Sequence, residues 1–433
     1  MREAELMARD RWSREDLVAF QRERVRALIT HTVAHSPYYR EALGTDAADR
    51  PLTELPTLPK ATMMAEFDRV VTDPRLRLAD LQEHLGSANP LQSFLGAFRV
   101  ATTTGTTGRR SIVAFTLNEA AAWRAASARP MMRMGVGFGR GFAALGSPSP
   151  VHLTRQVLVP PGVPASPFSE ATPVPELVAA LNAQQPEVLV GAAGIWRVLA
   201  DEQLEGRLRI APRAAFFSSE PLRADLRRLV RDAWGIEPVS GYAATEAPTI
   251  ATSSPEHSEM EIAEDVVVIE IVDEDDRPVP PGQPGAKVVL TNLINYAQPL
   301  IRYELTDSVV ESPLPNPAGR PWRCLLSVDG RTEDILYLLG RGGSTVAVHP
   351  SILDSAIAPM AEVGEYAFVY DAKGLHAQVV LAPGAATDIS ERLGQALVAA
   401  LGSTGAVPPS VDVQVVSALQ REPGGKLRFV RSA

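Results

Sequence analysis

The sequence has 433 residues, of which 45% are hydrophobic and 21% charged, and its formal net charge is −9. This length predicts two domains, and the negative charge excludes a protein whose main partner is a nucleic-acid backbone. The single cysteine, Cys324, excludes a disulfide framework and a cysteine-rich zinc site, and the lack of a secretion signal or of an apolar run of about 18 residues predicts a cytoplasmic protein without a membrane span.

In the first half of the chain, helical and strand-like patterns alternate. Helices are expected where apolar or alanine-rich stretches have helical spacing, at residues 12–44, 62–67 and 119–134. Asn118 is the predicted N-cap of the third helix. A strand is expected at 112–115, and short apolar and helical runs alternate from 141 to 215. The alternation favours a mixed α/β fold over an all-α or all-β fold.

The pattern changes near residue 262. Short apolar runs predict strands at 266–272, 287–290, 335–339, 367–370 and 377–381. A helix is expected at 389–401, with Asp388 as its N-cap. Because compact strands start afresh after Gly330, we predict a large N-terminal domain of mixed sheets and helices at 1–330 and a small α+β domain at 331–433.

A run of threonine and glycine precedes two arginines in the first half of the chain. Glycine lets a backbone approach a phosphate, and hydroxyls with free amides donate to its oxygens. The run lacks the GxxxxGK[ST] pattern of a Walker A loop. A polar hairpin turn is the alternative interpretation. The candidate phosphate-binding residues are Thr103, Thr104, Gly105, Thr106, Thr107 and Gly108.

Two further motifs lie between residues 218 and 246. Ser219, Glu220 and Pro221 follow the apolar run 214–217, where a strand end and a helix N-cap explain them equally well. The stretch GYAATE places the ring of Tyr242, the hydroxyl of Thr245 and the carboxylate of Glu246 within five residues. These groups suit stacking on a base, contact with a phosphate and binding of Mg²⁺, respectively.

Three motifs lie later in the chain. The stretch PLIRYELTD ends in Asp307, whose carboxylate suits the two hydroxyls of a ribose, although the stretch also fits a strand leading into a turn. Arg331 lies in the charged segment GRTED at the predicted domain boundary, where a solvated linker is the alternative. Lys426 lies on a glycine-rich loop near the carboxyl end, a setting in which most lysines are simply exposed.

In their order along the chain, the six motifs resemble the adenylate-forming superfamily of acyl-CoA synthetases, adenylation domains and luciferases. The similarity is greatest to phenylacetate–CoA ligases and covers nearly the whole chain, from HTVAHSPYY at His31 to Lys426. It implies an AMP-forming ligase that uses ATP and Mg²⁺ to activate a small, aryl acid as an acyl-AMP, releases pyrophosphate and transfers the acyl group to coenzyme A. It leaves open whether the protein is a homodimer.

The resemblance also implies roles for the motif residues. The loop from Thr103 to Gly108 would close over the ATP phosphates, and the segment at Glu220 would lie along the adenine. Tyr242 would stack on the adenine, Thr245 would touch the α-phosphate and Glu246 would hold Mg²⁺. Asp307, helped by Arg331, would bind the ribose. Glu333 would be the hinge about which the small domain moves, and Lys426 would reach the α-phosphate and the attacking carboxylate.

The chain departs from the family pattern at several positions. Arg110 ends the phosphate loop where a proline is usual, Ala243-Ala244 replaces a glycine after the tyrosine, and Thr306 replaces a glycine before the ribose aspartate. The segment NPAGRPW at 316–322 stands where some relatives have a cysteine-rich patch. These changes keep the adenylation residues but weaken the assignment of phenylacetate and coenzyme A, and they suggest a divergent member from a specialised biosynthetic pathway.

Other acceptors and a non-enzymatic role remain as alternatives. The alternatives for the group that accepts the acyl moiety are coenzyme A, a carrier-protein thiol and an amine. Nitrite is an alternative for the activated acid, as in a diazotase acting on an aryl amine. A nucleotide-binding protein without catalysis is less consistent, because Glu246 and Lys426 are both present. Coenzyme A would call for a basic groove, for which the candidates are Arg320, Arg323 and Arg341. The acid pocket is expected between the GAAGIW region at 191–196 and residues 216–246.

Overall fold

The computed structural model describes most of the chain. The residues that it describes are 3–102, 111–136, 141–145, 151–153, 156–157, 172–191, 193–217, 222, 224–331, 336–343, 345–348, 350–357, 360, 362–381, 388–420 and 429–432. None of the helices within these ranges is long and apolar enough to cross a membrane.

Helices dominate the first 86 residues. They are α1 (Glu3–Ala8), η1 (Arg9–Arg11), α2 (Arg14–His35), α3 (Pro37–Leu43), η2 (Ala47–Asp49), η3 (Leu52–Glu54), α4 (Lys60–Ala65), α5 (Phe67–Val70) and α6 (Leu78–Gly86). Ser13 starts α2 with a capping box that includes Asp16. Ser36 caps α3, whose first residue is Pro37, a favoured residue at this position. The predicted helical stretch 12–44 is therefore two helices with a break at Ser36.

An eight-stranded sheet forms the centre of the molecule, with the strand order β12-β13-β8-β7-β6-β5-β4-β3. Its strands are β3 (Phe142–Leu145), β4 (Val188–Gly191), β5 (Ala214–Phe217), β6 (Val239–Ala244), β7 (Ala247–Ser254), β8 (His257–Ile262), β12 (Asp307–Glu311) and β13 (Cys324–Arg331). Strands β3 to β6 are parallel, whereas those from β6 to β12 are antiparallel. The change of direction occurs at β6, the strand that carries Tyr242.

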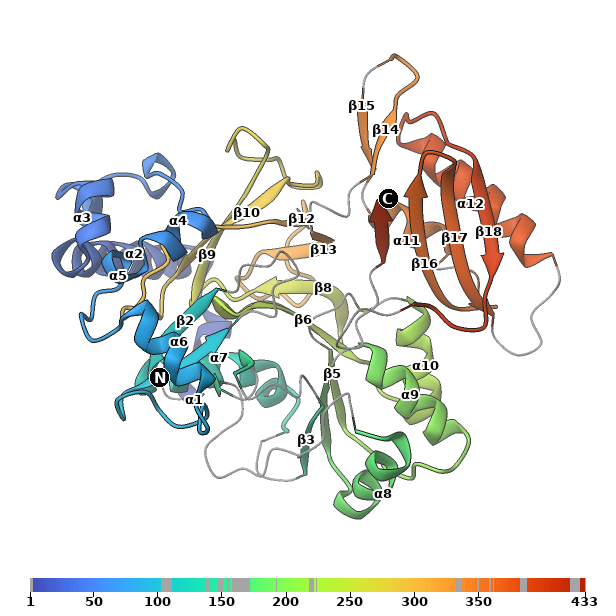
Figure 1. The fold of residues 1–433 in the computed structure, drawn as a ribbon, viewed down its shortest axis with the longest axis horizontal. Coiled ribbons are helices and arrows are strands. Elements are labelled where there is room, and N and C mark those ends of the chain that lie inside the picture. The colour runs from blue at the N-terminus through green and yellow to red at the C-terminus, as the bar shows by residue number, and fades with distance from the viewer. Residues whose placement is uncertain are drawn as a thin grey trace.

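Helices cover both faces of the parallel part of this sheet. Alternate residues of β3 to β5 pack on one side against α8 (Val174–Gln184), α9 (Ala193–Leu204) and α10 (Ala224–Trp234). Figure 1 shows these helices beside β5. The intervening residues pack on the other side against α7 (Leu117–Arg133). Burial on both faces explains why these strands are continuous apolar runs in the sequence.

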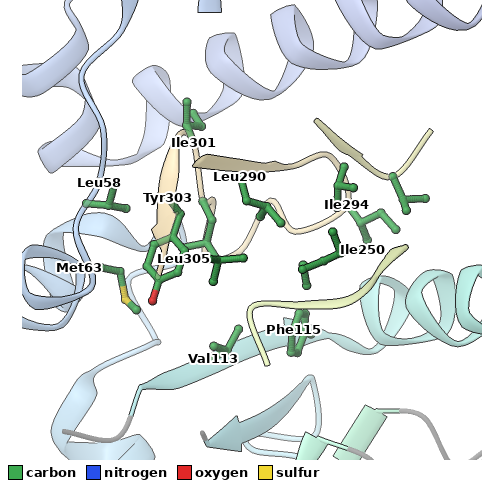
Figure 2. Close-up of a cluster of buried hydrophobic side chains, with 14 of the residues drawn as sticks. Leu58, Met63, Val113, Phe115, Ile250, Leu290, Ile294, Ile301, Tyr303 and Leu305 are labelled. Atoms are coloured by element: carbon green, nitrogen blue, oxygen red, sulfur yellow. The ribbon is translucent and has the colours of Figure 1, made fainter. Parts of the chain in front are cut away.

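Two smaller sheets pack against α7 and the N-terminal helices. One pairs β1 (Phe98–Thr102) with β2 (Ile112–Thr116), and the other has the order β11-β10-β9. Strands β9 (Val267–Val272), β10 (Lys287–Asn292) and β11 (Tyr303–Leu305) are antiparallel. Their apolar side chains form one large buried cluster with those of β2 and α4, part of which is drawn in Figure 2.

The C-terminal part has its own sheet and its own hydrophobic core. The sheet order is β18-β17-β16-β19, from β16 (Val363–Asp371), β17 (Gly374–Leu381), β18 (Val411–Val415) and β19 (Val430–Ser432). Its core includes side chains of α11 (Pro350–Ile357) and α12 (Ile389–Ser403) and of the hairpin of β14 (Leu336–Leu339) and β15 (Thr345–Val348). Figure 1 shows this sheet beside α9 and α10, and an ion pair of 3.1 Å joins Arg197 on α9 to Glu365 on β16.

The observed elements confirm the predicted α/β class but correct the cap of one helix. Thr116, and not Asn118, caps α7, because the Thr116 hydroxyl accepts a hydrogen bond from the Glu119 amide while the Glu119 carboxylate accepts one from the Thr116 amide. Asp388 does precede α12, as predicted, but its side chain makes no capping hydrogen bond.

Candidate functional site

Tyr242 and Asp307 are in direct contact, although their strands are not neighbours in the large sheet. Tyr242 lies on β6, Asp307 is the first residue of β12, and the Tyr242 hydroxyl donates a hydrogen bond of 2.8 Å to Asp307 Oδ2. Tyr242 is 8% exposed. Burial raises the pKa of its hydroxyl well above the usual value, and the carboxylates of Asp307 and Glu246 raise it further. The tyrosine therefore remains a neutral donor, and the sequence-predicted adenine and ribose residues are in direct contact.

Glu246 lies close to this pair, in the two-residue turn between β6 and β7. Ala244 and Ala247 are paired across the turn, so Thr245 and Glu246 occupy its tip. Thr245 is half-buried, whereas Glu246 is only 4% exposed. Glu246 Oε1 accepts a hydrogen bond of 2.9 Å from the Tyr303 hydroxyl, and its carbonyl accepts one of 2.8 Å from Asn292 Nδ2.

The charge of Glu246 has no cationic partner among the described residues. The ion pairs in this part of the chain do not include Glu246, and no hydrogen bond from a described residue reaches its second oxygen. A buried carboxylate without a cation is costly, by several kcal/mol. Magnesium needs only one or two protein carboxylates, because water and substrate phosphates complete its shell. The environment of Glu246 therefore fits a Mg²⁺ ligand, although the described residues contain no cluster of three metal-binding side chains.

Buried amides hold the strand that follows the threonine–glycine loop. Gln298 Oε1 accepts a hydrogen bond of 2.8 Å from the Ala114 amide, and its Nε2 donates one of 3.1 Å to the Ile112 carbonyl. Asn295 Nδ2 donates to the Ala114 carbonyl at 2.9 Å. Both side chains are fully buried. These hydrogen bonds satisfy backbone groups on the edge of β2 that does not pair with β1. The segment 292–298 therefore fixes the position of the start of β2.

Several predicted site residues cannot be compared with this geometry. Arg331 pairs with Asp307 across β12 and β13, which brings the two predicted ribose-binding positions together, although only its backbone is described. The other predicted site residues lie outside the described residues: Thr103, Thr104, Gly105, Thr106, Thr107, Gly108, Ser219, Glu220, Pro221 and Lys426.

Tyr303, Asn292 and Gln298 were not assigned a role from the sequence. Tyr303 belongs to the motif that ends in Asp307, but the motif alone does not indicate that its hydroxyl reaches Glu246. A usable signal was the spacing of Asn292, Asn295 and Gln298, three amides three residues apart in an otherwise apolar stretch. Buried amides of this kind have to be hydrogen-bonded.

The proposed basic groove is not supported for two of its three arginines. Arg320 is paired with Glu261 and Glu256, and Arg323 with Glu264 and Glu311. The expectation that they provide a free groove for coenzyme A is wrong, because carboxylates already neutralise them. Arg341 is exposed and donates to the Gly402 carbonyl.

Trp196, from the region expected to form the acid pocket, is part of the helix-covered core. Its ring is fully buried and lies 4.9 Å from that of Phe217 and 5.9 Å from that of Trp234, between centroids. The same core contains residues of α8, α9 and α10. Trp196 therefore packs behind the sheet, and its ring does not belong to the site at Tyr242.

Known proteins are similar to this chain in sequence and in fold. Residues 100–292 match the AMP-binding enzyme family. Over 371 residues the chain is 26% identical to the phenylacetate–coenzyme A ligase of Thermus thermophilus, covering 81% of this chain and 77% of that protein. It is 28% identical to the phenylacetate–coenzyme A ligase of Pseudomonas putida, covering 80% and 76%.

A solved structure supports the same classification at the level of the fold. The crystal structure of 2-hydroxyisobutyryl-CoA ligase in the postadenylation state, in complex with R3-HIB-AMP, aligns with a TM-score of 0.73 at 20% identity, covering 95% of this chain and 89% of that one. The match at residues 100–292 and the relatives together support an adenylate-forming enzyme. Over 76–81% of its length, the chain is similar to phenylacetate–CoA ligases.

Proposed function

We propose that this protein uses ATP and Mg²⁺ to convert a small aryl carboxylic acid into an acyl-AMP, with release of pyrophosphate, and then transfers the acyl group to coenzyme A. The curated relatives, all phenylacetate–coenzyme A ligases, support the aryl acid and the thiol acceptor. The division into residues 1–330 and a mobile domain at 331–433 is part of the proposal, and the separate hydrophobic core of residues 336–430 supports it.

The observation that carries the proposal is the position of Glu246. Its buried carboxylate has no cationic partner among the described residues and lies beside the hydrogen-bonded pair of Tyr242 and Asp307. A nucleotide bound here would place its ribose at Asp307, its adenine against the Tyr242 ring and its phosphates towards the turn that contains Thr245. A metal held by Glu246 would offset the repulsion between the triphosphate and the attacking carboxylate.

In the first half-reaction, each proposed site residue has a separate role. The acid oxygen attacks the α-phosphorus, and the bond to pyrophosphate breaks in line with the attack. Thr245 contacts the α-phosphate, and Lys426 brings a positive charge to the α-phosphate and to the attacking carboxylate. Thr103 to Gly108 enclose the leaving pyrophosphate. Rotation about Glu333 then removes Lys426 and admits the thiol, a conformational step that controls access to the acyl-AMP.

The first test is pyrophosphate release from ATP with a panel of aryl, alkyl and amino acids and nitrite, each with and without coenzyme A. We expect one aryl acid to give release that coenzyme A accelerates. Release that is indifferent to coenzyme A would keep the adenylation step and assign the acceptor to an amine or a carrier protein. Release with nitrite and with no carboxylic acid would identify nitrite as the activated substrate. No release with any acid would contradict the proposal.

Two variants test the assigned residues. Lys426→Ala should abolish acid-dependent release while the protein stays folded, because the transition-state charge loses its cation. Glu246→Gln should raise the Mg²⁺ concentration needed for half-maximal rate. An unchanged rate in the first variant, or an unchanged Mg²⁺ titration in the second, removes that residue from its role.

A further inference from the structure

We propose that Tyr303 is a positioning residue that orients the Glu246 carboxylate for the metal ion. The inference rests on the proposed function, because it assumes that Glu246 binds the metal. This role requires no contact of Tyr303 itself with the metal or the nucleotide. It acts through one hydrogen bond, from its hydroxyl to Glu246 Oε1, at 2.9 Å.

The environment of Tyr303 makes this donor rigid. The residue lies on β11, is 1% exposed, and its ring stands among Leu58, Met63 and Leu305 (Figure 2). Leu58 also forms a β-bridge with Tyr303. The Tyr303 hydroxyl is the donor in its contact with Glu246, because an ionised carboxylate only accepts hydrogen bonds.

The hydrogen bond leaves the two carboxylate oxygens unequal. Oε1 is occupied by the Tyr303 hydroxyl, whereas no described residue donates to Oε2. The main chain of Glu246 is held separately, since Asn292 Nδ2 donates to its carbonyl. Because the main chain and Oε1 of Glu246 are both held, the carboxylate presents Oε2 in one orientation. A carboxylate held in this way binds a metal more tightly than one that rotates freely.

The test is Tyr303→Phe, which removes the hydroxyl and keeps the ring in its apolar surroundings. The probe is Mn²⁺, and its binding is followed by the loss of the free-ion electron paramagnetic resonance signal. The protein is saturated with an ATP analogue that carries a methylene group between the α- and β-phosphorus. We expect the dissociation constant for Mn²⁺ to rise about tenfold, the lower end of the range for losing a group that orients a ligand.

The matched control is Tyr39→Phe. Tyr39 belongs to the same buried cluster and is 2% exposed, but its hydroxyl donates to the Pro299 carbonyl and accepts from the Ile301 amide. Its removal should lower the melting temperature and leave the Mn²⁺ constant within twofold of the parent. A rise of equal size in both variants would show a general loosening of the cluster and would overturn the inference.

The Glu246→Gln variant separates the two proposals. If Glu246→Gln loses Mn²⁺ binding and Tyr303→Phe does not, Glu246 is the metal ligand and Tyr303 has no positioning role. If Glu246→Gln binds Mn²⁺ like the parent, the metal site of the proposed function fails as well. Should Tyr303→Phe prove unfolded, Glu246→Asp draws the carboxylate away from the hydroxyl without altering the cluster, and unchanged Mn²⁺ binding there would equally overturn the inference.

Discussion

Replacing Gln298 by methionine should destabilise β2 locally. Methionine retains the length and volume of the glutamine side chain, so the change leaves little cavity. It removes three side-chain hydrogen bonds, one of which is a weak one to Met63 Sδ at 3.4 Å. The backbone groups that lose their partners are the Ala114 amide and the Ile112 carbonyl, at 2.8 and 3.1 Å from the Gln298 amide. Water has no access to replace them, because Gln298 is fully buried.

The size of the effect follows from these two groups. A buried backbone group that loses its partner costs about 1–3 kcal/mol, so two such groups cost about 2–6 kcal/mol. The appropriate measurement is hydrogen–deuterium exchange of a peptide that covers β2, because it reports this strand directly. Since each 1.4 kcal/mol is a factor of about ten in an equilibrium constant, exchange at Ala114 should accelerate at least about tenfold.

A second amide provides the control. Asn182 also makes two side-chain hydrogen bonds to backbone groups, with the Arg209 amide at 2.7 Å and the Arg207 carbonyl at 2.9 Å, but these contacts are exposed to water. Asn182→Leu should therefore cost about 1 kcal/mol or less. If Gln298→Met leaves exchange in β2 unchanged, or if the two variants lower stability equally, the reasoning from burial is refuted.

Three further outcomes are expected. Tyr242→Phe should raise the KM for ATP several-fold with a smaller change in kcat, as measured by pyrophosphate release, because Asp307 loses its hydrogen bond but keeps its charge. Asp265→Asn should lower the free energy of unfolding in urea by about 3–5 kcal/mol, since it leaves the buried Arg129 without its carboxylate and the buried Arg9 with only the exposed Glu5. Glu264→Gln should make the free energy of unfolding depend less on pH in acid. Burial raises the pKa of Glu264, but its arginine partners outweigh burial, so the folded-state pKa is lowered. The stabilisation is therefore present above the unfolded pKa of about 4.3 and is lost as pH falls through the lower folded value. A melting curve with the same acid dependence in that variant would contradict the assignment.

Local patterns in the sequence were sufficient to predict most elements of the fold. The strands β9 and β10 and the helix α12 lie within two residues of the predicted limits at each end, because apolar periodicity reports which face of an element is buried. The cap of α7 was misassigned because Thr116 and Asn118 are both good N-cap residues. The spacing Thr116–Glu119 is that of a capping box and would have selected the correct residue.

Pairings between distant residues were the part that the sequence could not provide. Arg320 and Arg323 were predicted to be available for coenzyme A, yet each is matched to carboxylates from about 12 to 64 positions away along the chain. The contact of Tyr303 with Glu246 spans 57 positions. Such pairs depend on the order and register of strands in the sheets, which local propensity does not determine.

The segment from Asn292 to Tyr303 connects the parts of the site that the motifs identify separately. Asn292 holds the main chain of Glu246, Gln298 holds the strand that leads out of the threonine–glycine loop, and Tyr303 holds the Glu246 carboxylate. Because all three belong to one short segment buried in one cluster, a shift of this segment moves the candidate metal ligand and the start of β2 together. The proposed metal ligand and the start of β2 are therefore held by one segment, which the motifs alone do not indicate.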